Sequence, residues 1–418
     1  MPQEHHKPLA GRRLLVVSTN YAPELTGIGP YAAQLAEHWA GAGADTHVLT
    51  GMPHYPSWRT EPAYRGVWRA DEQRSGVTVH RRRHYVPPRQ SALRRAAFEA
   101  SVLAHGLAAP PAVRPDAVIA QLPTLAGGVI GARLARRHGV PYLPVVQDLM
   151  GAAAQSGIPG GGRAAALASR AERYALGAAA LVGVIHESFV PRVAAYGVAP
   201  DRIRVVPNWS HVQAPSADRA ATRARLGWPE GTPVVLHSGN MGLKQGLEVL
   251  VDAARLAPGI RFVLMGDGNQ RDALRARASG LSNLDFLPPA CPDEFTDVLA
   301  AADVLAVTQR ASVLDMSVPS KLTSYFVSGR PVVASVADEG GTAQEVQRSG
   351  AGLLVAPEDP AAVLAAVRKL AEEPAAADEL GSHGPRYVAR HLSREAGLAR
   401  FDALLAEVLR DAEGTHRR

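Results

Sequence analysis

Cysteine is almost absent from this sequence: Cys291 is the only one in 418 residues. A single thiol excludes an intrachain disulfide and a cysteine-rich zinc site, so we expect a reducing, cytoplasmic setting. Long apolar runs are also missing, since no stretch reaches the ~18 apolar residues that cross a bilayer. Near the N-terminus, the apolar run 14–17 is too short for the core of a secretory signal. We therefore expect a protein that is soluble or lies on a membrane surface.

Aromatic residues and lysines are scarce as well. Aromatics make up 5% of the chain and no recognition module is visible, which disfavours nucleic-acid binding. Only four of the 45 basic residues are lysines, so Lys244 and Lys321 stand out, because an ammonium and a guanidinium are not interchangeable. Residues 1–210 hold 23 basic against 13 acidic residues, whereas 211–418 hold 22 against 26. This asymmetry indicates two domains with different partners.

Short apolar runs alternate with longer amphipathic stretches along the chain. Runs of this kind are typical of strands buried in a parallel sheet. We expect strands at 14–17, 45–50, 77–80, 117–120, 142–146, 181–185, 234–237, 261–265, 284–287, 304–307, 331–334 and 352–355. We expect helices after Pro30 and at 125–137, 246–256, 269–279, 292–301, 319–328, 342–348 and 360–371. Strands that alternate with helices predict an α/β fold.

The order of these elements predicts two Rossmann-like, doubly wound parallel-sheet domains. They would span 1–207 and 218–393, joined by a linker at 208–217 that is rich in proline and serine. An amphipathic helix at 394–410 is left over. Doubly wound sheets bind ligands beyond the carboxyl ends of their strands, so two facing domains would share a cleft.

The loop after strand 234–237 has the composition of an anion site. It contains Gly239, Gly242 and Gly246, with Lys244 among them. Glycines let the backbone approach a ligand closely, and the lysine and the start of the next helix favour a diphosphate. The alternative is an ordinary turn with a surface lysine.

A second site of this kind is expected where helix 319–328 begins. Ser320 and Lys321 lie in its first turn, and Ser324 follows one turn later on the same face. The alternative is a capped helix with a solvated lysine. A weaker third signal is the loop that carries Gly27 and Gly29 after the first strand, which could line the same cleft from the other domain.

Several stretches in fixed order resemble the family 4 glycosyltransferases of the GT-B fold. The resemblance is closest to the branch of colanic-acid fucosyltransferase-like and N-acetylfucosamine-transferase-like enzymes. It is carried by residues 20–29, 51–58, 147–149, 205–209, 238–246, 266–268, 319–321 and 329–331. The resemblance implies a retaining, metal-independent glycosyltransferase of the hexosyltransferase type, without a cofactor, in cell-surface or exopolysaccharide synthesis.

The resemblance also implies which residues bind substrates. The C-terminal domain would bind a nucleotide-sugar and the N-terminal domain a saccharide or polyprenyl-diphosphate-linked acceptor, with the last helix crossing back to the N-terminal domain. Donor contacts would come from Gly27, Gly29, Gly239, Asn240, Lys244, Gly266, Ser320, Lys321 and Ser324. The chain departs from the family where Met316 and Ser324 replace a pair of glutamates and Asn240 replaces an arginine.

The acceptor side offers His54 and Asp148 as catalytic candidates. Asp148 follows an apolar run and could act as a general base, but the interpretation that we favour is a helix cap. His54, in a proline-rich loop, could equally be structural. Six arginines and no acidic residue occupy 81–95, ahead of an amphipathic helix that ends near 107. This region either docks on an anionic membrane, such as the inner face of the cell membrane, or packs on the sheet with solvated arginines.

Two other functions share this architecture. A nucleotide-sugar 2-epimerase would need acid and base groups in the cleft, which the C-terminal motifs lack. A non-catalytic, membrane-associated partner with a degenerate donor site is compatible with the missing glutamate pair.

Overall fold

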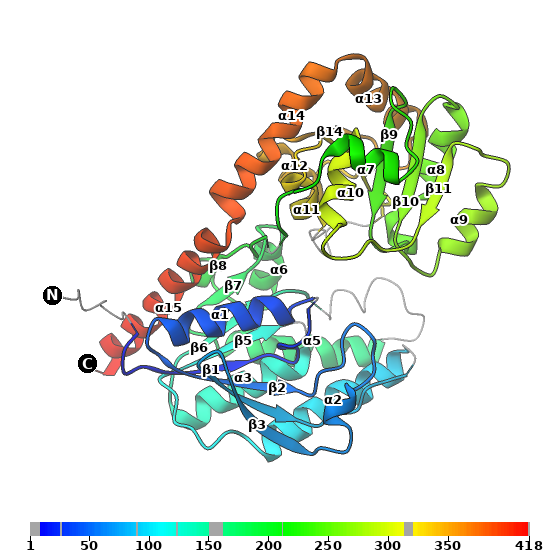
Figure 1. Cartoon of the computed structure of the whole chain (residues 1–418). Helices are drawn as coiled ribbons and strands as arrows, with labels where there is room; N and C mark the ends of the chain where they lie inside the picture. Colours follow the sequence, from blue (N-terminus) through cyan, green and yellow to red (C-terminus); the bar gives the residue numbers. More distant parts are fainter. Residues whose placement is uncertain are drawn as a thin grey trace. The chain divides into compact units, whose positions relative to one another are not determined.

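The computed structural model describes residues 9–25, 27–88, 91–122, 124–149, 162–210, 212–312 and 321–416. The chain divides into two compact units (Figure 1). The first comprises Met1–Asn208 and Leu398–Arg418, and the second comprises Trp209–Gly397. Each unit is an α/β domain built on its own sheet, which confirms the expected fold class.

The first unit contains an eight-stranded sheet in the order β3-β4-β2-β1-β5-β6-β7-β8. The strands are β1 Arg13–Val17, β2 Asp45–Gly51, β3 Arg69–Arg74, β4 Val77–Arg82, β5 Ala117–Leu122, β6 Tyr142–Val146, β7 Val182–Val184 and β8 Ile203–Val205. All pair in parallel except β3, which runs antiparallel to β4 at the edge. In the centre, Leu15 of β1 lies between His47 of β2 and Val118 of β5.

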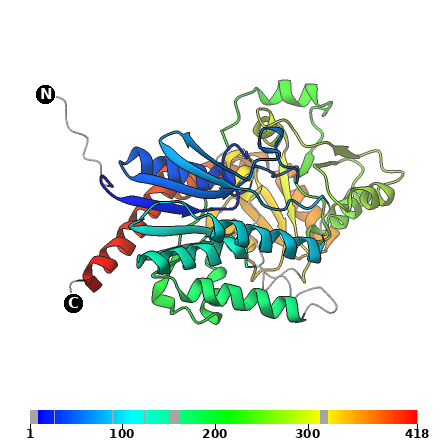
Figure 2. The same cartoon turned by 90° about the horizontal axis from the view of Figure 1, so that it is seen from below.

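Helices cover this sheet because its strands are apolar on both faces. They are α1 Gly29–Gly41, α2 Ala92–Ala108, α3 Leu125–His138, α5 Gly162–Gly177 and α6 Phe189–Ala195. The helices α2, α3 and α5 pack side by side on one face (Figure 2). There Phe98, Ile130 and Leu176 meet the strand residues Val17 and Val118, and all five are buried.

The last helix, α15 Arg394–His416, returns to the first unit as expected. Its Asp402 carboxylate accepts hydrogen bonds from Trp39 Nε1 at 2.9 Å and from His38 Nε2 at 2.8 Å, both on α1. Leu404, Leu405 and Val408 of the same helix are buried. The helix is therefore part of the core of the first unit.

The second unit has a six-stranded parallel sheet in the order β11-β10-β9-β12-β13-β14. The strands are β9 Val234–Ser238, β10 Arg261–Met265, β11 Leu284–Leu287, β12 Val304–Thr308, β13 Val332–Ser335 and β14 Gly352–Val355. The helices are α7 Arg219–Arg225, α8 Glu248–Leu256, α9 Arg271–Arg277, α10 Phe295–Ala301, α11 Lys321–Val327, α12 Gly341–Ser349, α13 Pro360–Glu372 and α14 Pro374–Tyr387, with a 3-10 turn at Leu243–Gln245 and a π-turn at Val388–Leu392.

Alternate residues of these strands supply two separate cores. On β10, Phe262 and Leu264 face the core formed with α8, α9 and α13. Val263 and Met265 face the opposite core, formed with α10, α11 and α12. The period of two that defines a strand thus puts apolar side chains on both faces, as a doubly wound sheet requires.

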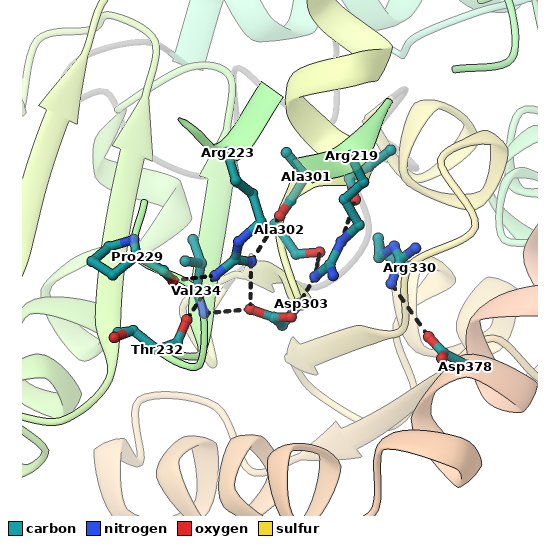
Figure 3. Close-up of polar contacts among 11 residues, drawn as sticks. Arg219, Arg223, Pro229, Thr232, Val234, Ala301, Ala302, Asp303, Arg330 and Asp378 are labelled. Atoms are coloured by element: carbon teal, nitrogen blue, oxygen red, sulfur yellow. Dashed lines mark hydrogen bonds and ion pairs between the residues drawn. The ribbon is translucent and has the colours of Figure 1, made fainter. Parts of the chain in front are cut away.

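An arginine–aspartate network joins α7 to the amino ends of β9 and β12 (Figure 3). Asp303 accepts hydrogen bonds from Arg223 Nη1 at 2.9 Å and from the backbone N–H of Val234 at 2.8 Å, and it also pairs with Arg219. Arg330, from the family motif at 329–331, pairs with Asp378 at 3.3 Å in the same region. This motif therefore lies at the amino ends of the strands, at the opposite end of the sheet from the loop that begins at Gly239.

Candidate functional site

The strand order of the second unit indicates a ligand site at the carboxyl ends of its central strands. The central strand β9 has β10 on one side and β12 on the other, so the chain winds away from it in both directions. Ligands of doubly wound sheets bind at such a switch point, beyond the carboxyl ends of the two strands. The segments that follow β9 and β12 begin with Gly239 and Gln309.

At this end of the sheet, the backbones of the loop after β9 and the loop after β10 are in direct contact. The N–H of Met241 donates to the carbonyl of Asp267 at 2.8 Å, and the N–H of Gly239 donates to Met265 at 2.9 Å. Gly266 has φ +138°, and a Cβ built on it would lie 2.0 Å from the carbonyl oxygen of Gly239. Gly266, which the resemblance placed among the donor contacts, is thus buried under Gly239 and permits the close approach of the two loops.

The ammonium group of Lys321 lies beside Gly239, on the side of the loop where a side chain at Gly239 would stand. Its Nζ lies 3.4 Å from Nε2 of His237, and 3.3 Å from the position that a Cβ on Gly239 would occupy. Burial lowers the pKa of Lys321 to about 8. Among the described residues no carboxylate pairs with this amine, so its charge is not compensated within this part of the chain.

His237 and Tyr325 fix the position of Lys321. Nδ1 of His237 donates to the carbonyl of Ala306 at 3.2 Å, so Nε2 is left to accept from the lysine. Burial, with a smaller contribution from Lys321, holds the pKa of His237 well below its usual range, and the ring is neutral. The hydroxyl of Tyr325 accepts from the N–H of Ser238 at 2.7 Å and ties α11 to the end of β9.

Lys244 lies in the 3-10 turn that follows, and its side chain is exposed. Arg310 secures this turn: its N–H donates to the carbonyl of Lys244 at 3.1 Å and its Nε to Leu243 at 2.8 Å. The same guanidinium pairs with Glu248 at 2.7 Å and Glu358 at 3.1 Å. The turn is thus held through its backbone, and the ammonium group of Lys244 projects into solvent.

The start of the next helix departs from the expectation at two of its N–H groups. The sequence predicted a helix from about residue 246 with free N–H groups, but α8 begins at Glu248. Gly246 adopts φ +58° and ends the 3-10 turn. The N–H groups of Val249 and Leu250 bond to the carbonyls of Gly246 and Leu247, so they are not available to an anion.

The other donor-side candidates divide into three groups. Asn240 is exposed, and a Cβ built on Gly242 would lie 2.9 Å from its amide nitrogen. Ser324 is 7% exposed and lies within α11. Ser320 and Met316 lie outside the described residues.

In the first unit, the loop with Gly27 and Gly29 packs against the loop that carries His54. Oε1 of the buried Glu24 accepts hydrogen bonds from the N–H groups of His54 at 2.7 Å and Tyr55 at 2.9 Å. Gly27 has φ +68°, and a Cβ on it would lie 3.1 Å from the Tyr55 ring. Gly29 begins α1, as the following proline predicted. Sequence reasoning missed Glu24, which joins the two loops.

His54 and Asp148 have opposite surroundings. His54 is 2% exposed, donates from Nδ1 to the carbonyl of Met52 at 3.0 Å, and packs edge-on against the rings of His84 and Trp58. Burial lowers the pKa of His54. Asp148 is exposed just after β6, where its carboxylate accepts from the N–H of Leu149 at 2.8 Å.

The basic stretch 81–95 does not face solvent as a whole. Arg81 is fully buried and pairs with Glu72 at 2.5 Å, and Arg82 pairs with Asp71 at 3.1 Å. Both partners come from the edge strand β3, which the sequence pattern did not predict. Arg95 pairs with Glu99 at 2.9 Å, and Arg89 lies outside the described residues. Arg81 and Arg82 are therefore not solvated, contrary to what both alternatives for this stretch had assumed.

Two features are absent from the described part of the chain. No group of three or more histidine, cysteine, aspartate or glutamate side chains is arranged there to hold a metal ion. None of the described helices combines the length and the apolar character that crossing a bilayer requires.

Comparison with known proteins adds two domain matches. Residues 26–209 match the glycosyl transferase 4-like domain, and residues 232–373 match the glycosyl transferases group 1 domain. The colanic acid biosynthesis glycosyl transferase WcaI of Escherichia coli (strain K12) is 33% identical over 375 residues, covering 85% of this chain and 91% of the relative. A D-inositol 3-phosphate glycosyltransferase of Acidothermus cellulolyticus is 29% identical, covering 87% of this chain and 83% of the relative.

Solved structures with the same fold cover nearly the whole chain. The sucrose-phosphate synthase of Thermosynechococcus elongatus superimposes with a TM-score of 0.74 at 20% identity, covering 96% of this chain and all of that one. HepE of Anabaena, in complex with UDP-glucose, gives a TM-score of 0.66 at 17% identity, with 94% and 99% of the two chains covered.

Proposed function

Because the chain belongs to the family 4 glycosyltransferases of the GT-B fold, we propose that it transfers a sugar from a nucleotide-sugar to a saccharide or polyprenyl-diphosphate-linked acceptor. The second unit binds the donor and the first binds the acceptor. The observation that supports this most directly is the half-buried ammonium of Lys321, which lies beside the Gly239 loop without a carboxylate partner in the described structure.

The donor diphosphate fits the chemistry of this corner of the second unit. Lys321 and Lys244 supply positive charge, and Gly239 lets phosphate oxygens approach the backbone. Asn240, Ser320 and Ser324 complete the contacts with the diphosphate, sugar or ribose. HepE of Anabaena has been crystallised with UDP and with UDP-glucose, so a uridine nucleotide is the first donor to test.

Transfer retains the anomeric configuration and needs no divalent cation. As the bond from the sugar to the diphosphate breaks, negative charge grows on the leaving group. The ammonium group of Lys321, already held beside Gly239 by His237, stabilises that charge as a metal ion would.

On the acceptor side, we assign different roles to the two catalytic candidates. Asp148 is exposed beyond the end of β6, so it accepts the proton of the acceptor hydroxyl. His54 is buried and hydrogen-bonded through its own loop, so it positions residues 52–58 and does not touch substrate.

The acceptor belongs to cell-surface or exopolysaccharide synthesis, which agrees with the name of the Escherichia coli relative. The enzyme works in the cytoplasm, on the inner face of the cell membrane. The first turns of α2 support this contact, because Leu93 is 83% exposed and Arg94 follows it.

Calorimetry of UDP binding in EDTA tests the donor site. Lys321→Met and Lys244→Ala should each weaken binding about tenfold or more, because a hydrogen bond to a charged group contributes about 1.5–3 kcal/mol. Lys369→Ala is the matched control, since Lys369 is an exposed lysine on α13. Equal affinities for the wild type, Lys321→Met and Lys244→Ala would refute the assignment.

A further inference from the structure

A cavity of about 570 Å³ in the first unit is not explained by donor binding. It lies beyond the carboxyl end of β4, between the segment after that strand, the loop at 58–60 and helix α2. Its volume falls within the range of ordinary small-molecule sites. The residues that decide its chemistry are Trp58, Arg59, Trp68, Arg83, Tyr85 and His105.

Aromatic rings on this cavity are unusually exposed. Trp68 is 66% exposed and Tyr85 39%, although the chain as a whole is poor in aromatics. Large exposed rings that gather at a concave surface mark a binding groove. Their flat faces are apolar while their edges carry polar groups, which suits ligands such as sugars that combine C–H faces with hydroxyls.

The cavity is positively charged as well. Arg59 and Arg83 are exposed, no carboxylate lines the cavity, and neither guanidinium has an ion-pair partner among the described residues. The adjacent Arg81 and Arg82, in contrast, are both paired with carboxylates of β3. Two guanidiniums without carboxylates are suited to the oxygens of a phosphate, which each can bind through two N–H groups.

These groups are held in place before any ligand arrives. The guanidinium of Arg83 lies 4.8 Å over the Trp68 ring, and the His105 ring meets Trp68 edge-on at 5.9 Å. His105 Nδ1 is also hydrogen-bonded to the carbonyl of Arg83, and the N–H of Tyr85 donates to Ser101 at 2.8 Å. Strand β4 and helix α2 thus fix the spacing between the rings and the charge, which lowers the entropy cost of binding.

We propose that this cavity binds a glycosyl phosphate, with the sugar ring against Trp68 and Tyr85 and the phosphate on Arg59 and Arg83. The proposal rests on the proposed function, in which the first unit binds the acceptor. It places the phosphate-bearing end of that acceptor in this cavity. Either a lipid-linked glycosyl diphosphate or a free sugar phosphate supplies this chemistry.

Calorimetry on the full chain tests the cavity with glucose 1-phosphate, methyl glucoside and inorganic phosphate as probes. Glucose 1-phosphate should bind at least tenfold more tightly than either of the others. Trp68→Ala and Arg83→Gln should each weaken that binding about tenfold, whereas Arg114→Gln, a change at another exposed arginine of this unit, should not. A farnesyl glycosyl diphosphate that binds more tightly than glucose 1-phosphate, with the same dependence on Trp68 and Arg83, supports the lipid-linked source. Equal affinity of the two probes supports the free sugar phosphate.

The experiment also separates this proposal from donor binding. UDP affinity should not change in Trp68→Ala. If glucose 1-phosphate binding is lost in Lys321→Met and kept in Trp68→Ala, the probe occupies the donor site and the cavity assignment is wrong. Absence of binding at millimolar probe likewise overturns it. If UDP fails to bind but glucose 1-phosphate still depends on Trp68, the cavity assignment stands and the donor site fails.

Discussion

Nζ of Lys321 lies 3.4 Å from Nε2 of His237, so a neutral imidazole, and not a carboxylate, holds this cation. A carboxylate in that place would neutralise the ammonium before a ligand arrived. An imidazole accepts one N–H and leaves the positive charge available. Over the described residues, the arrangement thus leaves the ammonium of Lys321 without a compensating carboxylate beside the backbone of Gly239.

UDP binding should depend on pH through Lys321. Burial lowers the pKa of Lys321 to about 8, and only the ammonium form attracts a diphosphate. Affinity should therefore fall as pH rises above about 8, by up to tenfold for each further unit. In Lys321→Arg the charge persists, and calorimetry between pH 7 and 9.5 should give a flat profile. A fall of the same size in both proteins would place the titrating group elsewhere.

The same depressed pKa makes a prediction about stability. Between about 8 and the usual lysine value of 10.5, the unfolded chain binds a proton at this position that the folded chain does not. The free energy of unfolding should therefore gain a positive contribution as pH rises through this window. Comparing urea midpoints of the wild type and Lys321→Met across the window measures it, and parallel curves would contradict it.

Buried histidines of the first unit should destabilise the protein in mild acid. Burial and the neighbouring His54 lower the pKa of His84 to about 3, so below pH 6.5 the unfolded state takes up a proton that the folded state refuses. One such proton costs about 1.4 kcal/mol for each pH unit. Urea midpoints of His84→Gln should therefore fall less steeply from pH 6.5 to 4.5 than those of the wild type. Equal slopes would show that His84 does not contribute.

Replacing Gly266 by alanine should lower the free energy of unfolding more than the same replacement of a glycine in an ordinary turn. A Cβ there would lie 2.0 Å from the Gly239 carbonyl oxygen, so the two loops must separate. Gly266→Ala should lower the free energy of unfolding by about 3 kcal/mol and weaken UDP binding. The control is Gly280→Ala, where φ is +83° but nothing lies within 4 Å, with an expected loss of about 1 kcal/mol. Equal losses would mean that the close approach of the loops is unimportant.

Two aspartates in Figure 3 should differ in their contributions to stability. Asp303 accepts from Arg223, whose side chain is 7% exposed, and from the N–H of Val234. Its removal leaves a largely buried cation without a carboxylate, so Asp303→Ala should cost about 2–4 kcal/mol. Asp378 is 72% exposed, and Asp378→Ala should cost less than about 1 kcal/mol. Thermal unfolding of both variants decides this, and a larger loss in Asp378→Ala would reverse the interpretation.

The sequence predicted most strands because buried parallel strands are apolar throughout. It missed β3, Arg69–Arg74, whose residues are mostly charged or polar. An edge strand of this kind forms because β4 offers it an unpaired backbone and two buried arginines, and neither is visible in a local pattern. The short β8 was missed for a similar reason, since Ile203–Val205 is too brief to give a periodic signal.

At the proposed donor site, the sequence motifs pointed to Lys321 and Gly239 but not to the residues that support them. Gly239 lies in a glycine-rich loop after a strand, and Lys321 lies in the first turn of a helix, and both positions are recognisable from the sequence. His237 and Tyr325 read as ordinary residues of a strand and a helix, and only the packing of α11 on β9 brings them to the lysine. An apolar run that ends in a histidine just before a glycine loop was the one available signal.

The bonds from Trp39 and His38 to Asp402 have a consequence for synthesis of the chain. During translation, residues 1–208 leave the ribosome long before residues 398–418, which complete the first unit. Until the C-terminal helix emerges, the groove that will receive Leu405 stays open to solvent and to other nascent chains. The N-terminal half must wait for the whole second unit to be translated, so premature termination yields a fragment with an unfinished, aggregation-prone core.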